Sequence, residues 1–439
     1  MVESKRYGTI HVLRTFIALC LSIYFFGHIA SFAQDSPPFV QSVTTDASQS
    51  RLAKLVTEAL RNNPAIQAAR NVSDARREMV PVARTLPDPT LSFQHMGDIF
   101  PFRLQRDDPS SARVFSIEQE FPFPGKLGLR SDILQAEYEA ENENLTKTRL
   151  QVLSELKTAY YNLYLADKSI AILRKNKDLL EDFSEIADTK YQLGQGIQQD
   201  VLRSQVEISR VIDRLVVMEQ RRGSIEGEIN GLLNRPQGSS IAPVTGIEKS
   251  PMPPTLDELI ESARNSSPSL KIQEQEIEKN RDRVELARKE FYPDFSLGFS
   301  YFDRTVPEMY GLMINLRVPL YFWRKQSLEL KSAAFELSGS IRLLEGMTAS
   351  LEARIKDLYL MATANSRLIE LYRDGVIPQA TLSLESAVAG YQVGSVDFLT
   401  VLDSFLILLD YELKYHEALA DFQKTLASLE PLTGAELCR

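Results

Sequence analysis

The sequence predicts a mainly α-helical chain with a transmembrane β part, built from a duplicated helix-strand-strand-helix repeat. Three observations lead to this fold class. The stretches 191–202 and 391–403 both contain Tyr-Gln-x-Gly followed seven residues later by Val-Leu, and they lie about 200 residues apart. Pro-Asp pairs close two corresponding helical patterns, at Pro87-Asp88 and Pro293-Asp294. After each pair the residues alternate between apolar and polar, which indicates strands and not helices.

The first 33 residues have the pattern of a secretory signal peptide. Three basic residues precede an apolar run, Thr15 to Phe26, and the segment ends in Ser31-Phe32-Ala33. This is a charged start, a short apolar run and a small-x-small cleavage site. The run is shorter than the roughly 20 residues that span a bilayer. We therefore expect residues 1–33 to be removed on export across a bacterial inner membrane.

Charge and cysteine content exclude other classes of protein. The chain of 439 residues has a formal charge of −9, which becomes −11 when residues 1–33 leave with three basic groups and one acidic group. Such an acidic chain does not favour nucleic acid as a partner. Cys20 lies in the expected signal peptide, so Cys438 remains alone and no internal disulfide can form. No run of 18 apolar residues follows residue 33, so we expect no transmembrane helix.

The first repeat is expected over residues 51–235, after an extended, Ser- and Pro-rich lead-in at 34–50. Its opening segment has helical spacing, and Pro64 stands where a helix can start afresh. Apolar residues then alternate with polar ones in two strands, at about 88–96 and 112–121, which a polar loop joins.

A very long helix is expected next, after the turn Phe121-Pro-Phe-Pro-Gly-Lys126. From Leu127 to about Leu193 there is almost no Pro or Gly, and apolar residues between Val152 and Leu173 alternate in steps of four and three. This is a coiled-coil seam, and a helix of this length measures roughly 100 Å. Gly194 and Gly196 break the pattern before a second helix.

The second repeat is expected over residues 255–430, between a Pro- and Gly-rich linker at 236–254 and a C-terminal tail at 431–439. Its strands are expected at about 294–303 and 310–319, and a long seam of apolar residues in steps of four and three follows them. The same order of patterns therefore occurs twice in the chain.

The end of the second repeat differs in one respect from the first. Gly375 and Pro378 are expected to interrupt its long helix. The last helix is expected from Asp397 to about Leu429.

The expected strands have one apolar, aromatic face and one small or polar face. The flanking segments are long helices, which are not suited to cover the apolar face. Aromatic residues at strand ends resemble the interfacial girdles of an outer-membrane barrel, namely Phe295, Tyr301, Tyr310 and Trp323. Lipid tolerates only closed sheets, and four strands cannot close, so copies must combine: two give about 8 strands and three about 12. A soluble sheet packed on a core is the alternative.

In the order and spacing of these landmarks the chain resembles the TolC-type outer-membrane efflux proteins, over roughly residues 50–430. The resemblance rests on the turn at 121–126, on the Tyr-x-x-Gly stretch of each repeat, and on Ile377-Pro-Gln-Ala380. The Phe-Pro-Gly-Lys and Ile-Pro-Gln-Ala forms are similar to members that serve resistance-nodulation-division pumps, including metal-cation exporters. The resemblance implies a homotrimer in the bacterial outer membrane, with a trimeric 12-stranded β-barrel continued by a long α-helical barrel in the periplasm.

The resemblance also implies a gate at the periplasmic tip, where the Tyr-x-x-Gly stretches lie and the helices close the tube. Acidic side chains and polar links between helices hold the closed state in the family. By position, Asp200, Tyr391 and Asp403 match gate residues of the family. These three residues are therefore candidates for the constriction.

Two positions depart from the family's gate. Val396 and Thr400 stand where relatives can carry Arg and Asp, so the family's salt-bridge lock is not expected in that form. Asp397 lies beside the departure and is the candidate substitute. The alternative is structural, because Asp200 and Asp397 both suit a helix N-terminus.

The expected function is passive conduction and not catalysis. Substrates would come from an inner-membrane pump through a periplasmic adaptor protein, and the chain would contact outer-membrane lipid. The alternatives are the exit duct of a type I protein secretion system, a structural coiled-coil protein of the envelope, and an exported enzyme. No phosphate loop, Ser/His/Asp set or Cys/His cluster is present, so no cofactor is expected. Glu412 and His416 are spaced i, i+4, but two ligands do not make a metal site.

Overall fold

The computed structural model describes residues 51–100, 102–105, 108–304, 307, 309–434 and 437. The expected signal peptide and lead-in, residues 1–50, lie outside the described residues, as does Cys438. In chain order the elements are α2 (Arg51–Asn62), α3 (Pro64–Arg84), β1 (Thr90–Met96), β2 (Ala112–Phe121), α4 (Lys126–Gln192), α5 (Gln198–Leu232), α6 (Leu256–Ser266), α7 (Pro268–Lys289), β3 (Asp294–Asp303), β4 (Met309–Arg317), α8 (Lys325–Glu370), η1 (Leu371–Val376), α9 (Ile377–Gln392) and α10 (Phe398–Thr433).

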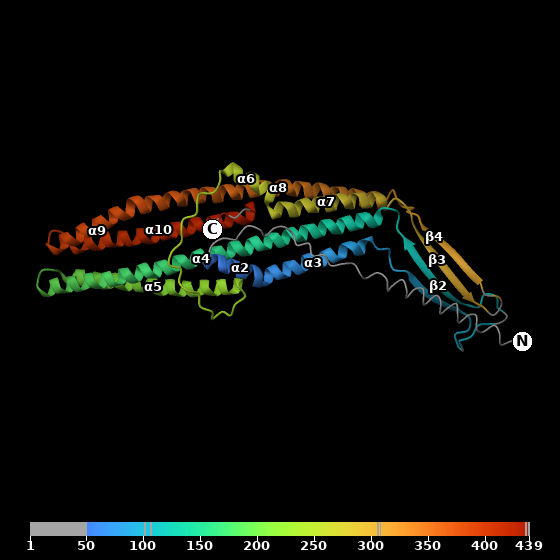
Figure 1. Ribbon diagram of the computed structural model, residues 1–439, viewed down its shortest axis with the longest axis horizontal. Helices are drawn as coiled ribbons and strands as arrows, with labels where there is room; N and C mark the ends of the chain where they lie inside the picture. The colour runs from blue at the N-terminus through green and yellow to red at the C-terminus, as the bar shows by residue number, and fades with distance from the viewer. Residues whose placement is uncertain are drawn as a thin grey trace. The chain divides into compact units, whose positions relative to one another are not determined.

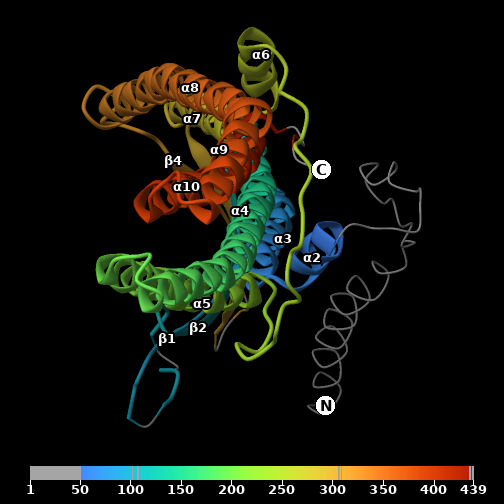
Figure 2. The same cartoon turned by 90° about the vertical axis from the view of Figure 1, so that its left-hand side faces the viewer.

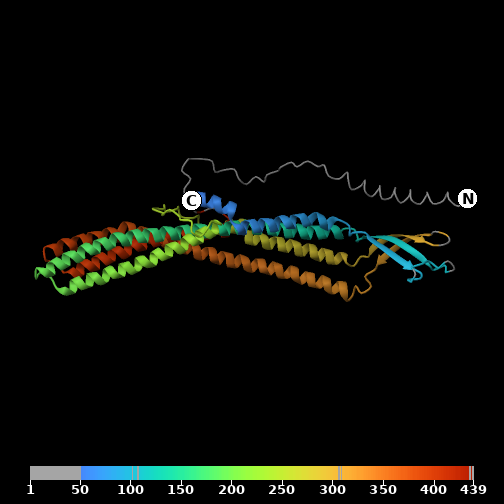
Figure 3. The same ribbon diagram turned by 90° about the horizontal axis from the view of Figure 1, so that it is seen from below.

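The two halves of the described chain repeat one arrangement. Each half runs from a pair of short helices through two strands into a long helix, and then turns back in a last helix (Figure 1). Helices α7 and α10 each pack against both long helices, α4 and α8, and the strands extend from one end of α3, α4, α7 and α8 (Figure 3). The turns between the long helices and their partners lie at the opposite end.

The seam that predicts the long helix α4 is buried. Leu156, Leu163 and Leu173 are almost completely removed from solvent. They belong to a core in which α10 packs against both α4 and α8, with Phe422 of α10 among its largest buried side chains. Helices of this length are stable because tertiary packing buries one face along them.

The expected linker at 236–254 contains no helix or strand, yet part of it is packed against the helices. Ile241 and Val244 are buried in the same core as α4 and α10. The backbone N–H of Val244 donates to Asp167 of α4 at 2.8 Å. The carbonyl of Glu248 accepts a hydrogen bond from Gln423 of α10, so the segment contacts both repeats.

The first helical segment is divided in two at Asn63. The Asn63 side chain accepts hydrogen bonds from the backbone N–H groups of Ala65 and Ile66, at 2.9 and 3.3 Å, and Pro64 follows as the first helical residue. An Asn cap followed by Pro is a strong start signal for a helix. In the second half Ser267 and Pro268 divide α6 from α7 at the matching place.

The expected interruption of the second long helix at Gly375 and Pro378 takes the form of a π-helical turn, and the helix does not break there. The helix continues from α8 through the π-helical turn η1 into α9. A π turn bonds each N–H one residue further back than an α turn does, so it absorbs an extra residue. Leu156 corresponds to Ile355, 199 residues later, whereas Gly194 corresponds to Gly394, 200 residues later. The π turn accommodates that one additional residue.

Three element ends differ from the expected bounds. The last helix, α10, continues to Thr433, so the first residues of the expected tail at 431–439 are helical, and Gly434 ends the helix in the left-handed conformation. Strand β1 begins at Thr90 and not at 88, and β4 ends at Arg317 and not at 319. Prolines 89 and 319 adjoin these ends, and proline has no N–H for the ladder.

The strands form one antiparallel sheet in the order β1-β2-β3-β4, so the pairing of β2 with β3 joins the two repeats. Side chains in register form apolar rows across one face. One row contains Leu91, Ile117, Phe299 and Leu312, and the next contains Phe93, Phe115, Tyr301 and Tyr310. The opposite face carries Ser92, Ser116, Ser300 and Gly311.

The apolar face of this sheet is not covered by any described part of the chain. Leu91 and Leu312 are each 77% exposed, and Phe93, Phe115 and Phe299 are about half exposed. Separately, none of the described helices is both long enough and apolar enough to span a membrane.

Candidate functional site: the helical tip and the sheet

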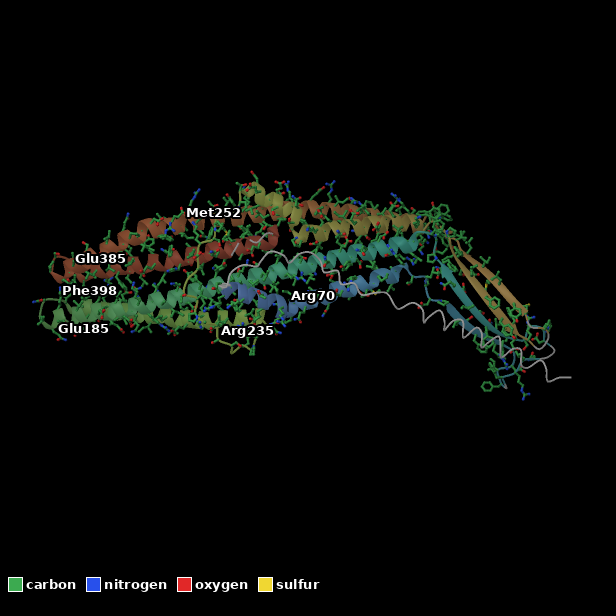
Figure 4. All side chains as sticks on the ribbon, in the orientation of Figure 1. Arg70, Glu185, Arg235, Met252, Glu385 and Phe398 are labelled. Atoms are coloured by element: carbon green, nitrogen blue, oxygen red, sulfur yellow. The ribbon has the colours of Figure 1, made fainter. Side chains whose placement is uncertain are left out.

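The turns α4–α5 and α9–α10 bring most of the predicted gate residues together. Asp200 lies in the first turn of α5, Asp397 caps α10, and Tyr391 lies in the last turn of α9. Figure 2 looks onto this end, where the α4–α5 pair and the α9–α10 pair face each other. Figure 4 marks the same end with Glu185, Glu385 and Phe398.

Both turns have the same backbone geometry. Gly194 and Gly394 adopt positive φ angles of 71° and 77°, which glycine reaches without strain. The N–H of each Gly donates to the carbonyl of the preceding Tyr, Tyr191 or Tyr391, at 3.0 and 3.2 Å. The next N–H donates to the carbonyl five residues back, at 2.8 and 2.9 Å. These paired bonds are Schellman caps, so the Tyr-x-x-Gly signal marks two equivalent helix ends.

A lysine links the two halves of the tip. Lys190, in the last turn of α4, donates a hydrogen bond to the backbone carbonyl of Tyr391. Its ammonium also lies 3.8 Å from the centre of the Tyr391 ring, a cation–π distance. One side chain thus binds both the backbone and the ring of the opposite helix pair.

The two carboxylates of the tip influence each other. Burial raises the pKa of Asp200, and the nearby charge of Asp397 raises it further. Hydrogen bonds from the Thr400 hydroxyl and N–H lower the pKa of Asp397. Burial, followed by the charge of Asp200, raises the pKa of Tyr391. At the tip, Asp397 therefore has a lowered pKa and keeps its charge more readily, whereas Asp200 has a raised pKa and loses its charge more readily.

The polar groups rest on an apolar cluster. Phe398 and Phe405 of α10 are buried, together with Leu180 of α4. The rings of Tyr391 and Phe398 lie 5.7 Å apart, and Phe183 meets Phe405 edge-on at 5.9 Å. This packing fixes the position of the Tyr391 ring.

Asp403 is separate from this cluster. It is exposed on α10, whereas Val401, Leu402 and Phe405 of the same helix are buried. Its carboxylate forms no hydrogen bond or ion pair with the described residues, so none of these balances its charge.

The four predicted interface aromatics lie on or beside the sheet. Tyr301 of β3 and Tyr310 of β4 are opposite each other, with ring centres 5.4 Å apart. Phe295 stacks on Phe121 of β2 at 5.3 Å. Trp323 is exposed in the turn after β4. The sheet thus carries aromatic groups near both ends of its strands.

A buried lysine fixes the sheet to the helices. Lys126, the first residue of α4, is 1% exposed, and its ammonium lies 2.9 Å from Glu290 and 3.0 Å from Asp294. The N–H of Phe123 also donates to Asp294, at 2.7 Å. These bonds connect the turn after β2 to the start of β3, and so connect the two repeats.

Sequence reasoning missed the roles of Lys190 and Lys126. A signal existed for Lys126, because a cation at a helix N-terminus is disfavoured unless carboxylates surround it. Lys190 had no such signal, because its partner is a backbone carbonyl 201 residues away.

Within the described ranges, no three His, Cys, Asp or Glu side chains gather closely enough to hold a metal ion. His416 does not pair with Glu412. Its Nδ1 shares a hydrogen bond with the Tyr164 hydroxyl at 2.7 Å. Burial and, second, the charge of Lys168 lower the pKa of His416 to about 4.

Three known proteins are similar to the chain over most of its length. The outer membrane protein TolC of Vibrio cholerae is 22% identical over 403 residues, which cover 87% of this chain and 90% of TolC. The cobalt-zinc-cadmium resistance protein CzcC of Cupriavidus metallidurans is 18% identical over 378 residues, covering 84% and 86%. The solved outer membrane channel MtrE of Neisseria gonorrhoeae has the same fold, with a TM-score of 0.74 at 16% identity, covering 94% and 99%.

A family match covers both repeats. The family described as outer membrane efflux protein matches residues 55–235 and 259–435. The chain belongs to the outer membrane efflux protein family, and its place is the bacterial outer membrane, with the helical part in the periplasm.

Proposed function

We propose that the protein is the outer-membrane exit duct of a tripartite efflux system and conducts substrates passively. The observation that carries the proposal is the uncovered apolar face of the sheet, at the end of long helices that bury continuous seams. An apolar face with aromatic residues near its ends suits lipid, and the opposite face of small and polar residues suits an aqueous channel.

Three copies form the duct. An open four-stranded sheet exposes unpaired backbone groups at β1 and β4, which lipid does not tolerate. Three sheets supply the 12 strands of a closed barrel, and the helices of three copies continue it as a tube in the periplasm. A closed ring of identical copies leaves no edge strand unpaired.

The tip acts as the gate. Lys190 holds the α4–α5 pair to the α9–α10 pair, while Asp200 and Asp397 repel each other nearby. Asp403 presents a carboxylate that has no partner among the described residues of its own chain, and three copies of it form the constriction. The link and the repulsion oppose each other, so small changes at the tip open or close the tube.

An inner-membrane pump supplies the energy for transport, and a periplasmic adaptor contacts the tip. The turn at 121–126 and the segment Ile377–Ala380 support a pump of the resistance-nodulation-division type. CzcC is a cobalt-zinc-cadmium resistance protein, and this similarity directs the first substrate test to divalent cations.

Conductance of the purified protein in planar bilayers tests the proposal. We expect trimers that resist dissociation by detergent and discrete channel currents. Protein that partitions into the outer membrane as trimers but passes no current would exclude the duct and favour a structural role. A host that lacks its own duct would regain tolerance to zinc, cobalt or cadmium only when pump, adaptor and this chain are present together.

A further inference from the structure

The sheet has two open edges and one internal joint between repeats. Strands β1 and β4 each have a single strand neighbour among the described residues, and β2 pairs with β3. The β2–β3 joint shows how the end of one repeat meets the start of another. The same meeting of β4 with β1 is possible only between two copies of the chain.

The repeat offsets of the strands come from two landmarks. Asp88 and Asp294 follow the matching prolines, so β1 corresponds to β3 at an offset of 206 residues. Phe121 and Val318 precede the matching prolines of the turns, so β2 corresponds to β4 at an offset of 197 residues.

The register of the sheet agrees with these offsets. Leu91 lies opposite Ile117 in the first repeat. The offset of 206 relates Leu91 to Leu297, and the offset of 197 relates Ile117 to Ile314. Leu297 and Ile314 do lie opposite each other in the second repeat. The two strand pairs are therefore equivalent residue by residue, and the offsets can be applied to the joint.

We propose that β4 of one copy pairs antiparallel with β1 of a second copy, with Leu316 opposite Leu91, and that Lys325 of the first copy forms an ion pair with Asp88 of the second. The register follows from the β2–β3 joint, in which Gln119 lies opposite Leu297. The offset of 197 relates Gln119 to Leu316, and the offset of 206 relates Leu297 to Leu91. It keeps the apolar rows continuous from one copy to the next. The inference rests on the proposed barrel and defines its joints.

The ion pair repeats the buried junction at Lys126. Lys325 stands at the start of α8 as Lys126 stands at the start of α4, and Asp88 corresponds to Asp294. Lys325 and Asp88 are both exposed in the single chain and form no ion pair there. Glu290 has no acidic counterpart in the four residues before Asp88, so the new junction contains one carboxylate where the internal one contains two.

The apolar part of the junction has counterparts too. Phe123 stacks on Tyr292 at 4.5 Å, and Tyr292 precedes the Pro-Asp pair. Phe322 stands three residues before Lys325, as Phe123 stands three residues before Lys126, and the offset of 206 relates Tyr292 to Leu86. Phe322 and Leu86 are both about half exposed in the single chain. The packing of the helices is consistent with this joint. Helix α4 packs against α3 of its own repeat and against α7 of the other repeat. Helix α8 packs against α7 of its own repeat but not against α3 of the other repeat. Phe335 of α8, 77% exposed, lies in the region that such a neighbour would cover.

Disulfide trapping tests the register. Ser92→Cys and Asn315→Cys, combined in a chain that carries Cys438→Ser, place two thiols opposite each other across the joint. We expect oxidation to give covalent dimers and trimers. The matched control, Gln94→Cys with Asn315→Cys, keeps both thiols on the polar face but shifts one by two residues, and we expect at least fivefold slower linkage. Equal or faster linkage of the control would overturn the register.

Charge reversal tests the ion pair. Lys325→Glu and Asp88→Lys, each alone, should lower the temperature at which the detergent-solubilised trimer dissociates, and the double variant should recover at least half of each loss. Lys331→Glu, on the exposed side of the same helix, is the control for a general charge effect. A double variant that dissociates at the lower of the two single-variant temperatures, or lower still, would overturn the pair.

The outcomes separate this inference from the proposed function. A wild-type chain that purifies only as a monomer counts against the barrel itself. A stable, conducting trimer in which the Ser92 and Asn315 thiols do not link retains the barrel and overturns the joint.

Discussion

Lys190 and Tyr391 connect the two halves of the tip, because the ammonium of Lys190 binds the carbonyl of Tyr391 and lies over its ring. The repeat makes this link one-sided. Residue 390 occupies the position of Lys190 in the second half, and it is glycine. At the tip, Lys190 of the first repeat therefore joins the two helix pairs, and the matching position of the second repeat has no side chain to do so.

The first prediction concerns this link. Lys190→Met keeps the length of the side chain and removes its charge. A charged hydrogen bond with a cation–π contact contributes about 2 kcal/mol, so the ratio of closed to open channels should fall about 30-fold for each of the three links that breaks on opening. Single-channel recording at fixed voltage measures this ratio. Lys175→Met, at an exposed lysine of the same helix, is the matched control. An unchanged ratio in Lys190→Met would show that the link does not hold the gate.

The second prediction concerns pH at the tip. Asp200 has a raised pKa in the packed tip, so the packed form binds a proton more readily than an open, solvated form does. Lowering the pH should therefore favour the closed gate, and conductance should fall at a pH above the ordinary titration of exposed carboxylates. Asp200→Asn should remove this pH-dependent fall in conductance, and the variant should conduct like the protonated wild-type protein at all pH values. Asp188→Asn, on α4, is the control, and a step that persists in Asp200→Asn would assign the titration to another group.

The third prediction concerns His416, which is packed on Tyr164 within the helical part. Its pKa is lowered from 6.5 to about 4, so below pH 6.5 the unfolded chain binds a proton that the folded chain does not. Stability should then fall as the pH decreases from about 6.5 to 4 and level off below, by about 2–3 kcal/mol. Thermal unfolding across this range measures the loss. His416→Gln should flatten this part of the pH profile, whereas His95→Gln should leave it in place.

Local patterns in the sequence predicted much of the fold. The alternation around Phe93 and Phe299 and the four-three spacing around Leu156 depend on neighbouring residues, and each period belongs to one type of element. The repeat also placed the Tyr-x-x-Gly turns correctly, because Gly194 and Gly394 are needed for positive φ angles.

Contacts between distant segments could not be predicted in this way. The burial of Ile241, the Lys190 link and the Lys126 junction each depend on how helices far apart in sequence pack, and no local period encodes that. The π turn was also missed, because Gly375 and Pro378 are ordinary helix breakers. Only the change of repeat offset along the chain reveals the extra residue there.

The last prediction concerns an exchange of side chains between the two turns. In the second turn Gly390 lies against Val396, and a Cβ at residue 390 would lie 2.6 Å from Cγ2 of Val396. In the first turn the sizes are reversed, because Lys190 carries the side chain and Gly196 has none. A Cβ at residue 196 would lie 3.2 Å from Cβ of Lys190. The turn thus has little room for two side chains at these positions.

Gly390→Ala should therefore destabilise the α9–α10 turn by about 1–3 kcal/mol through overpacking. Val396→Gly in the same chain should recover most of this loss, since it recreates the arrangement of the first turn. The two changes should couple by at least about 1 kcal/mol in a double-mutant cycle measured by thermal unfolding. Gly339→Ala, in α8, has no neighbour within 4 Å of the added Cβ and should be neutral or stabilising. Additive effects of Gly390→Ala and Val396→Gly would show that the turn relaxes around both side chains and that the exchange between repeats has no steric cause.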